Sequence, residues 1–182
     1  MSAPGAGPAP LVLALALDDA DQRHLDELRR RHFPPERLRV GAHVTLFHAL
    51  PGEELPAVLD AVREACRRPG FAVEVAGARS LGRGTALVLR SAELDALRAD
   101  LAGRFTPWLT RQDAQRFSAH VTVQNFVSPA EARELLARLS AGFVPWTVRA
   151  TGVQVHRYLG GPWEAVETVP LGRAPGEPVS RT

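Results

Sequence analysis

Short apolar runs alternate along the chain with segments whose apolar residues recur every three or four positions. The runs are typical of strands and the recurring positions are typical of amphipathic helices. The apolar or extended runs lie at 11–17, 39–50, 71–75, 85–89, 120–127, 146–158 and 163–171. The segments with helical spacing lie at 21–33, 55–66, 94–105 and 132–139. This pattern predicts an α+β protein.

Turn and capping residues separate these segments where the pattern changes. Pro34-Pro35 follows the first helical segment, and Pro51-Gly52 follows the second extended run. Ser128-Pro129-Ala130-Glu131 combines an N-cap, a proline at the first helical position and a capping-box glutamate. Gly82-Arg83-Gly84 lacks the spacing of a nucleotide-binding loop and lies between two extended runs, so we expect a turn there.

The two halves of the chain resemble each other in sequence as well as in element order. HVTL at 43–46 aligns with HVTV at 120–123, and FAVEVAG at 71–77 aligns with WTVRATG at 146–152. Such self-similarity indicates an internal duplication. We therefore predict a β-α-β-α-β unit used twice. The two lobes would be related by an approximate two-fold axis, with antiparallel-type sheets facing a central groove.

The repeat also sets the expected domain organisation. We predict a single bilobal domain over 11–172, with one lobe at about 11–80 and the other at about 83–172. Residues 1–10 and 173–182 are rich in Pro, Gly and Ala, and we expect them to be disordered tails.

Composition narrows the class of protein without deciding its function. Of the 182 residues, 45% are hydrophobic and 23% charged, which excludes a wholly disordered chain. The formal charge of +2 is too small to establish nucleic-acid binding, but every basic residue is an arginine, which suits bidentate contacts with phosphate. The single cysteine, Cys66, excludes an intramolecular disulfide and a cysteine-based zinc cluster, and its helical spacing places it in the core.

No targeting or membrane segment is expected from the sequence. The longest apolar run, 11–17, is far shorter than the ~20 residues of a membrane helix. The residues before it contain no arginine, so a secretory signal is not expected. We expect a cytoplasmic protein without a membrane partner, and a monomer in preference to an oligomer.

The repeated H-V-T segments are the strongest candidates for chemistry. Side chains alternate between the two faces of a strand. Val44, Leu46 and His48 then share one face of the first segment, and we expect the apolar faces to pack on helices of their own lobe. The opposite faces, which we expect to meet across the groove, carry His43, Thr45 and Phe47 in the first copy and His120, Thr122 and Gln124 in the second.

Two imidazoles and two hydroxyls in one groove suit reactions at phosphorus. Histidine has an ordinary pKa of about 6.5, so one ring can start neutral and the other charged near neutral pH. The neutral ring would take a proton from the attacking oxygen, and the charged ring would give one to the leaving oxygen. The threonine hydroxyls would donate to the phosphate oxygens. This scheme requires neither a metal nor another cofactor.

His-x-Thr on a strand, present once per lobe, resembles the signature of the 2H phosphoesterase superfamily, which includes 2′–5′ RNA ligases and 2′,3′-cyclic phosphodiesterases. The resemblance extends over 11–171. It implies that His43 and His120 are the acid–base pair and that Thr45 and Thr122 bind the phosphate. It also implies action, without metal or ATP, on 2′,3′-cyclic or 2′–5′-linked phosphodiesters of nucleotides or RNA ends. Reverse 2′–5′ RNA ligation would use the same pair.

Several residues near the motifs have two interpretations. Phe47 is expected on the groove face, where it would stack a base or plug the space between the lobes. Tyr158, beside the last turn, is expected to bind substrate at the rim of the groove. Arg116 and Arg157 would either reach a phosphate or remain solvated.

Two other classes of function remain as alternatives. One is a nucleotide- or RNA-binding module without turnover. The other is a metal-dependent hydrolase built on the four histidines His43, His48, His120 and His156. The metal interpretation is disfavoured because His48 should point away from His43 and because neither motif strand carries an Asp or Glu.

Overall fold

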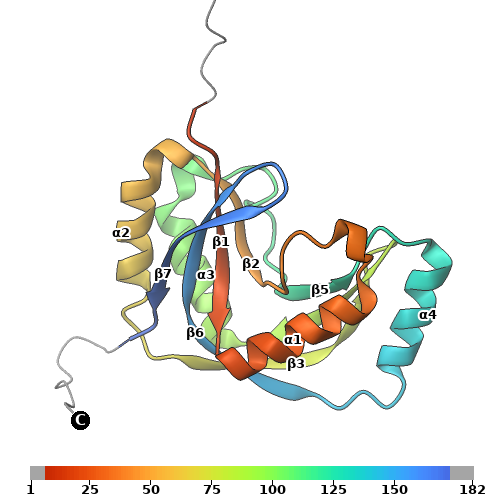
Figure 1. Ribbon diagram of the computed structural model, residues 1–182. Coiled ribbons are helices and arrows are strands. Elements are labelled where there is room, and N and C mark those ends of the chain that lie inside the picture. The colour runs from red at the N-terminus through yellow and green to blue at the C-terminus, as the bar shows by residue number, and fades with distance from the viewer. Residues whose placement is uncertain (1–6, 173–182) are drawn as a thin grey trace, which may run out of the picture.

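The computed structural model describes residues 7–172 (Figure 1). The strands are β1 (Leu11–Leu17), β2 (Thr45–Leu50), β3 (Phe71–Ser80), β4 (Thr85–Arg90), β5 (His120–Gln124), β6 (Trp146–Tyr158) and β7 (Trp163–Pro170). The helices are α1 (Asp19–His32), α2 (Leu55–Ala65), α3 (Ala92–Arg104) and α4 (Pro129–Ser140). Of the expected tails, 1–6 and 173–182 lie outside the described residues.

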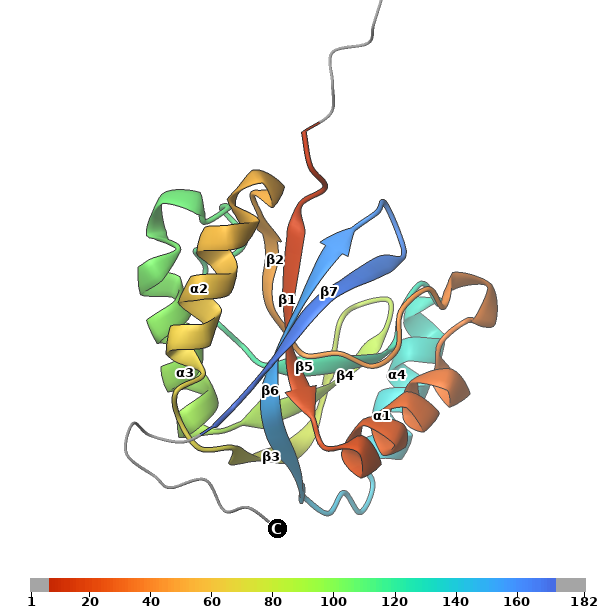
Figure 2. The ribbon, with the colours of Figure 1, turned by 60° about the vertical axis from the view of Figure 1, so that its left-hand side comes forward.

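All seven strands belong to one antiparallel sheet that curls strongly (Figure 2). Its order is β2-β1-β6-β3-β4-β5, and β7 pairs with β6. The long strand β6 unites the sheet: one edge pairs with β1, and the other pairs first with β3 and then with β7. The predicted α+β class with antiparallel pairing is confirmed.

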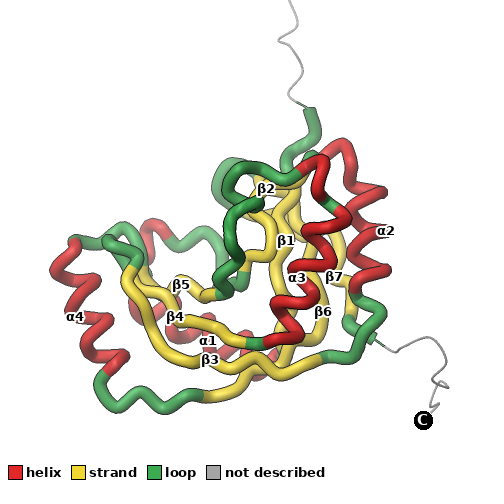
Figure 3. The backbone as a smooth tube through the Cα atoms, turned by 180° about the vertical axis from the view of Figure 1, so that it is seen from behind, coloured by secondary structure: helices red, strands yellow, loops and turns green. Residues whose placement is uncertain are grey.

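The helices form two pairs at opposite ends of the molecule (Figures 1 and 3). Helices α2 and α3 pack against each other beside β1 and β2, while α1 and α4 lie near β3, β4 and β5. Helix α1 of the first half thus contacts β5 of the second half. The expectation that each motif strand packs only on helices of its own half is therefore wrong, because the curled sheet brings β5 onto α1.

Side chains cap the starts of three helices. The side chain of Asp18 accepts from the Ala20 amide, and that of Ser91 accepts from the Leu94 amide. Ser128 and Glu131 form the predicted capping box. Gly82 and Gly84 belong to the turn between β3 and β4, where Gly82 has a φ of +81° and a Cβ on Gly84 would collide with the backbone of β5.

Strands β2 and β3 differ most in extent from the sequence prediction. The apolar run at 39–50 becomes a strand only from Thr45, so His43 lies in the segment just before β2. Strand β3 continues to Ser80, five residues further than predicted, because residues 77–80 pair with β4. Among the described residues, no helix combines the length and the apolar character needed to cross a membrane.

Candidate active site

The two H-V-T motifs come together because they lie at the two ends of the sheet order. β2 and β5 are the terminal strands, and the curl of the sheet turns them toward each other (Figure 2). Thr45 of the first motif and His120 of the second line the same hollow. Burial is the main cause that lowers the pKa of His43, and the charge of His120 adds to this shift. The structure thus unites the motifs in one site.

The two motif histidines are held in the same way. His43 Nδ1 lies 2.7 Å from the Gly41 carbonyl oxygen, and His120 Nδ1 lies 2.8 Å from that of Ser118. Each carbonyl belongs to the residue two positions before its histidine. Because a carbonyl only accepts, Nδ1 carries the proton in each ring, and Nε2 is left with its lone pair in the neutral form.

Both rings are biased toward the neutral state. Burial lowers the pKa of His43 to about 4; the contact with Gly41 opposes this shift, and the charges of Arg29 and His120 add to it. The pKa of His120 is also lowered, first by burial and then by the positive charge of Arg79. A phosphate anion beside these rings would raise both pKa values.

A guanidinium that the sequence analysis did not single out stands beside the second motif. Arg79 Nη2 lies 3.2 Å from His120 Nδ1. Arg79 Nε is buried and has no hydrogen-bond partner among the described residues. Arg79 reaches the site because β3 extends beyond the apolar stretch that predicted it.

A β-bulge corrects the expected positions of Phe47 and His48. Leu13 pairs with Phe47 while the next residue, Ala14, pairs with Thr45, so Leu46 is an extra residue and the alternation of faces breaks there. Phe47 is therefore fully buried rather than in the groove. Its ring lies 5.1 Å from that of Phe105 and 3.9 Å from the Arg98 guanidinium. The expected base-stacking role of Phe47 is wrong.

The same bulge turns His48 to the site, and Asp113 holds it there. The His48 side chain is 44% exposed and lines the hollow that contains Thr45 and His120. Its Nδ1 lies 2.8 Å from Asp113 Oδ1, and the amides of His48 and Ala49 also donate to this carboxylate. Burial raises the pKa of Asp113, but these hydrogen bonds outweigh burial and lower it below its ordinary value.

Two buried arginines brace the motif strands. Arg29 of α1 donates from Nε to the Val40 carbonyl at 3.0 Å and from Nη1 to that of Thr122 at 2.6 Å. Arg98 of α3 donates to the carbonyls of Leu46 and Asp113, each at 2.7 Å. Each arginine thus ties one motif strand to a segment of the other half. Burial lowers the pKa of both, that of Arg29 to about 10.

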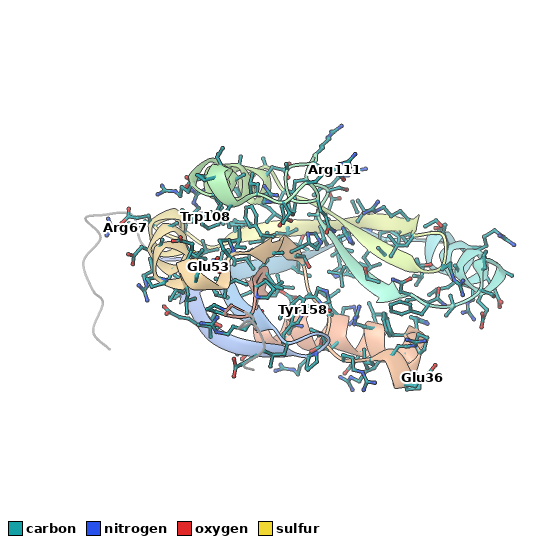
Figure 4. All side chains as sticks on the ribbon, turned by 90° about the horizontal axis from the view of Figure 1, so that it is seen from above. Glu36, Glu53, Arg67, Trp108, Arg111 and Tyr158 are labelled. Atoms are coloured by element: carbon teal, nitrogen blue, oxygen red, sulfur yellow. The ribbon has the colours of Figure 1, made fainter. Side chains whose placement is uncertain are left out.

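On its other side, His43 packs against the β6–β7 hairpin. Its ring centroid lies 4.6 Å from that of Trp163, which lies 5.3 Å from that of His156. These three residues line a second hollow of about 430 Å³. Tyr158 pairs with Trp163 at the hairpin tip and is 42% exposed (Figure 4). It does not line that hollow, so its contact with substrate stays a prediction.

Of the remaining candidate residues, Arg116 lies beside the second motif, whereas Arg157 and Cys66 make other contacts. Arg116 lines the hollow beside His120, whereas Arg157 donates to the Ala9 carbonyl at 3.4 Å and lines neither hollow. Cys66 is buried, and burial raises its pKa to about 11, which keeps the thiol protonated. Within residues 7–172, no group of three or more His, Cys, Asp or Glu side chains is placed to hold a metal ion.

The family follows from the match between this chain and a family model. The model of the 2′-5′ RNA ligase superfamily matches residues 17–162, which include both H-V-T motifs. The chain belongs to the 2′-5′ RNA ligase superfamily. This result confirms the resemblance to 2H phosphoesterases that the motifs indicate. Among curated proteins, none matches the chain.

Solved structures of three other proteins share the fold. E. coli LigT in complex with 3′-AMP has a TM-score of 0.64 at 20% identity, covering 91% of this chain and 99% of LigT. TT0787 of Thermus thermophilus has a TM-score of 0.66 at 17% identity, covering 89% and 97% of the two chains. Kluyveromyces marxianus Usb1 has a TM-score of 0.51 at 15% identity, covering 91% and 99%. At such identities the likeness is one of fold.

Proposed function

We propose that this 2H phosphoesterase is a phosphodiesterase that opens 2′,3′-cyclic or 2′–5′-linked phosphodiesters of nucleotides or RNA ends. The observation that carries the proposal is the matched setting of His43 and His120. Both rings bind a backbone carbonyl through Nδ1, so both present Nε2 for proton transfer. Membership of the 2′-5′ RNA ligase superfamily supports the substrate class.

The proposed reaction uses the two rings in opposite protonation states. On a 2′,3′-cyclic phosphate, water attacks phosphorus while the bond from phosphorus to O3′ breaks. The neutral ring accepts the proton of the water at Nε2, and the charged ring donates its Nε2 proton to O3′, which leaves a 2′-phosphate. Each transfer contributes roughly 10²–10⁴ to the rate. A 5′-hydroxyl in place of water would form a 2′–5′ linkage by the same steps.

The threonines and the local charge support this reaction. Thr45 and Thr122 are half-buried and lie two residues after the motif histidines, where their hydroxyls would donate to the non-bridging phosphate oxygens. Such a preorganised donor is typically worth about 10²–10³ in rate. The guanidinium of Arg79 adds positive charge on the Nδ1 side of His120. In this proposal the two histidines make the proton transfers and the two threonines bind the phosphate.

Turnover of adenosine 2′,3′-cyclic phosphate in the presence of a chelator tests the proposal. We expect His43→Gln and His120→Gln each to lower kcat by at least about 10². His24→Gln is the matched control, because His24 is exposed and contacts Trp146 rather than the site. Binding without turnover by the unaltered protein would favour a nucleotide-binding module, and loss of activity in chelator would favour a metal-dependent hydrolase.

A further inference from the structure

A hollow of about 270 Å³ opens beside the second motif, between β2, β3 and the segment before β5. It adjoins the proposed reaction site, because Thr45 and His120 line it, whereas His43 and Thr122 do not. We call it the side hollow. Its other polar lining includes His48, Arg79, Arg98, Asp113 and Arg116.

The charge of the side hollow suits an anion. Arg79 and Arg116 form no salt bridge with any described residue. The one carboxylate in the lining, Asp113, is 1% exposed and already accepts hydrogen bonds from His48 and two backbone amides. The side hollow therefore presents cationic donors without a free carboxylate to neutralise them.

Some side-chain nitrogens that line the side hollow have no hydrogen-bond partner among the described residues. Arg98 donates from two of its nitrogens to the carbonyls of Leu46 and Asp113. Arg79 Nε, by contrast, is buried and has no hydrogen-bond partner among the described residues. A buried, unsatisfied donor on a charged group is costly unless a ligand fills it. His48 binds Asp113 through Nδ1, which leaves Nε2 as its ring nitrogen for a ligand.

We propose that the side hollow binds a second phosphate of the substrate, the one on the 5′ side of the ribose that bears the scissile phosphate. This proposal rests on the proposed function. With the scissile phosphate between His43 and His120, the next phosphate of a nucleotide chain lies one ribose away, and the side hollow adjoins that position through Thr45 and His120. Arginine guanidinium groups are well suited to phosphate oxygens. The favoured substrates are RNA ends or 5′-phosphorylated nucleoside 2′,3′-cyclic phosphates.

Two substrates that differ only in the 5′-phosphate test this assignment. They are adenosine 2′,3′-cyclic phosphate and its 5′-phosphorylated counterpart. We expect kcat/KM of the unaltered protein to favour the 5′-phosphorylated substrate by at least about 10-fold, the effect of one charged hydrogen bond. Arg116→Gln and His48→Gln should each reduce this preference several-fold. Arg111→Gln is the control, because Arg111 is an exposed arginine of the same segment that does not line the side hollow (Figure 4).

A binding measurement keeps this test independent of turnover. By calorimetry, adenosine 2′,5′-bisphosphate should bind more tightly than adenosine 2′-phosphate, and Arg116→Gln should remove most of the difference. Equal affinities for the two ligands would overturn the proposal even if the protein is an active phosphodiesterase. An Arg116→Gln variant that loses the same factor on both substrates would also overturn it, because the side hollow would then hold the scissile phosphate itself. Tighter binding of the bisphosphate without turnover of either substrate would support the anion site and refute the proposed reaction.

Discussion

Replacing His43 by glutamine should make the protein less sensitive to acid, because the folded state resists protonation of this ring. Burial lowers its pKa from 6.5 to about 4. Above pH 6.5 the ring is neutral in both the folded and the unfolded chain. As the pH falls below 6.5, the unfolded chain binds a proton that the folded protein does not, so the wild type loses stability until about pH 4.

The size of this effect follows from the shift in pKa. Each unit is worth 1.36 kcal/mol, so at pH 5 the wild type has lost about 2 kcal/mol through this ring, and at pH 4 about 3 kcal/mol. His43→Gln removes this loss, while the other titrating groups are common to both proteins. The free energy of unfolding from urea titrations at pH 7 and pH 5 gives the comparison. Parallel pH dependences for the two proteins would refute the argument that this ring is held neutral.

Four further outcomes are expected. The bell-shaped pH dependence of kcat/KM should have its maximum below pH 6.5, because the pKa values of both rings are lowered; a maximum above pH 8 would contradict this. Arg98→Met should lower the free energy of unfolding, measured by denaturant titration, by about 2–5 kcal/mol, because two carbonyls lose their donor. Arg67→Met should change this free energy little, because Arg67 is exposed. Phe47→Ala should lower the free energy of unfolding by about 3–5 kcal/mol, and Phe126→Ala should lower it far less, because Phe126 is 57% exposed. Equal losses for the two variants would contradict the burial of Phe47. Cys66 should react with a thiol reagent only after unfolding, and rapid labelling of the native protein would contradict its burial.

The sequence was sufficient for the parts of the fold that depend on local pattern. The duplicated H-V-T segments, the capping box at Ser128 and the turn at Gly82 all follow from residue type and spacing. The α+β class follows from the alternation of extended and helical periods. These features need no knowledge of which segments meet in space.

The sequence was insufficient where a single backbone irregularity or a long-range contact decides the outcome. The bulge at Leu46 exchanges the faces of Phe47 and His48, and nothing in the local pattern of apolar residues marks its position. Asp113 lies in a turn before β5, outside any helix or strand, and is 65 residues from His48 in sequence. Arg29 stands in a run of three arginines in the sequence, yet it is buried because α1 lies on β5.

The position of a bound phosphate is the most direct test of the central claim, that the duplicated motifs act on one phosphorus atom. A crystal structure of the protein with adenosine 2′-phosphate would give that position. We expect the phosphate to lie between the rings, with Nε2 of both His43 and His120 and the hydroxyls of Thr45 and Thr122 at about 2.7–3.0 Å from its oxygens. A phosphate that contacts only one of the two histidines, with the other ring facing away from it, would contradict the account.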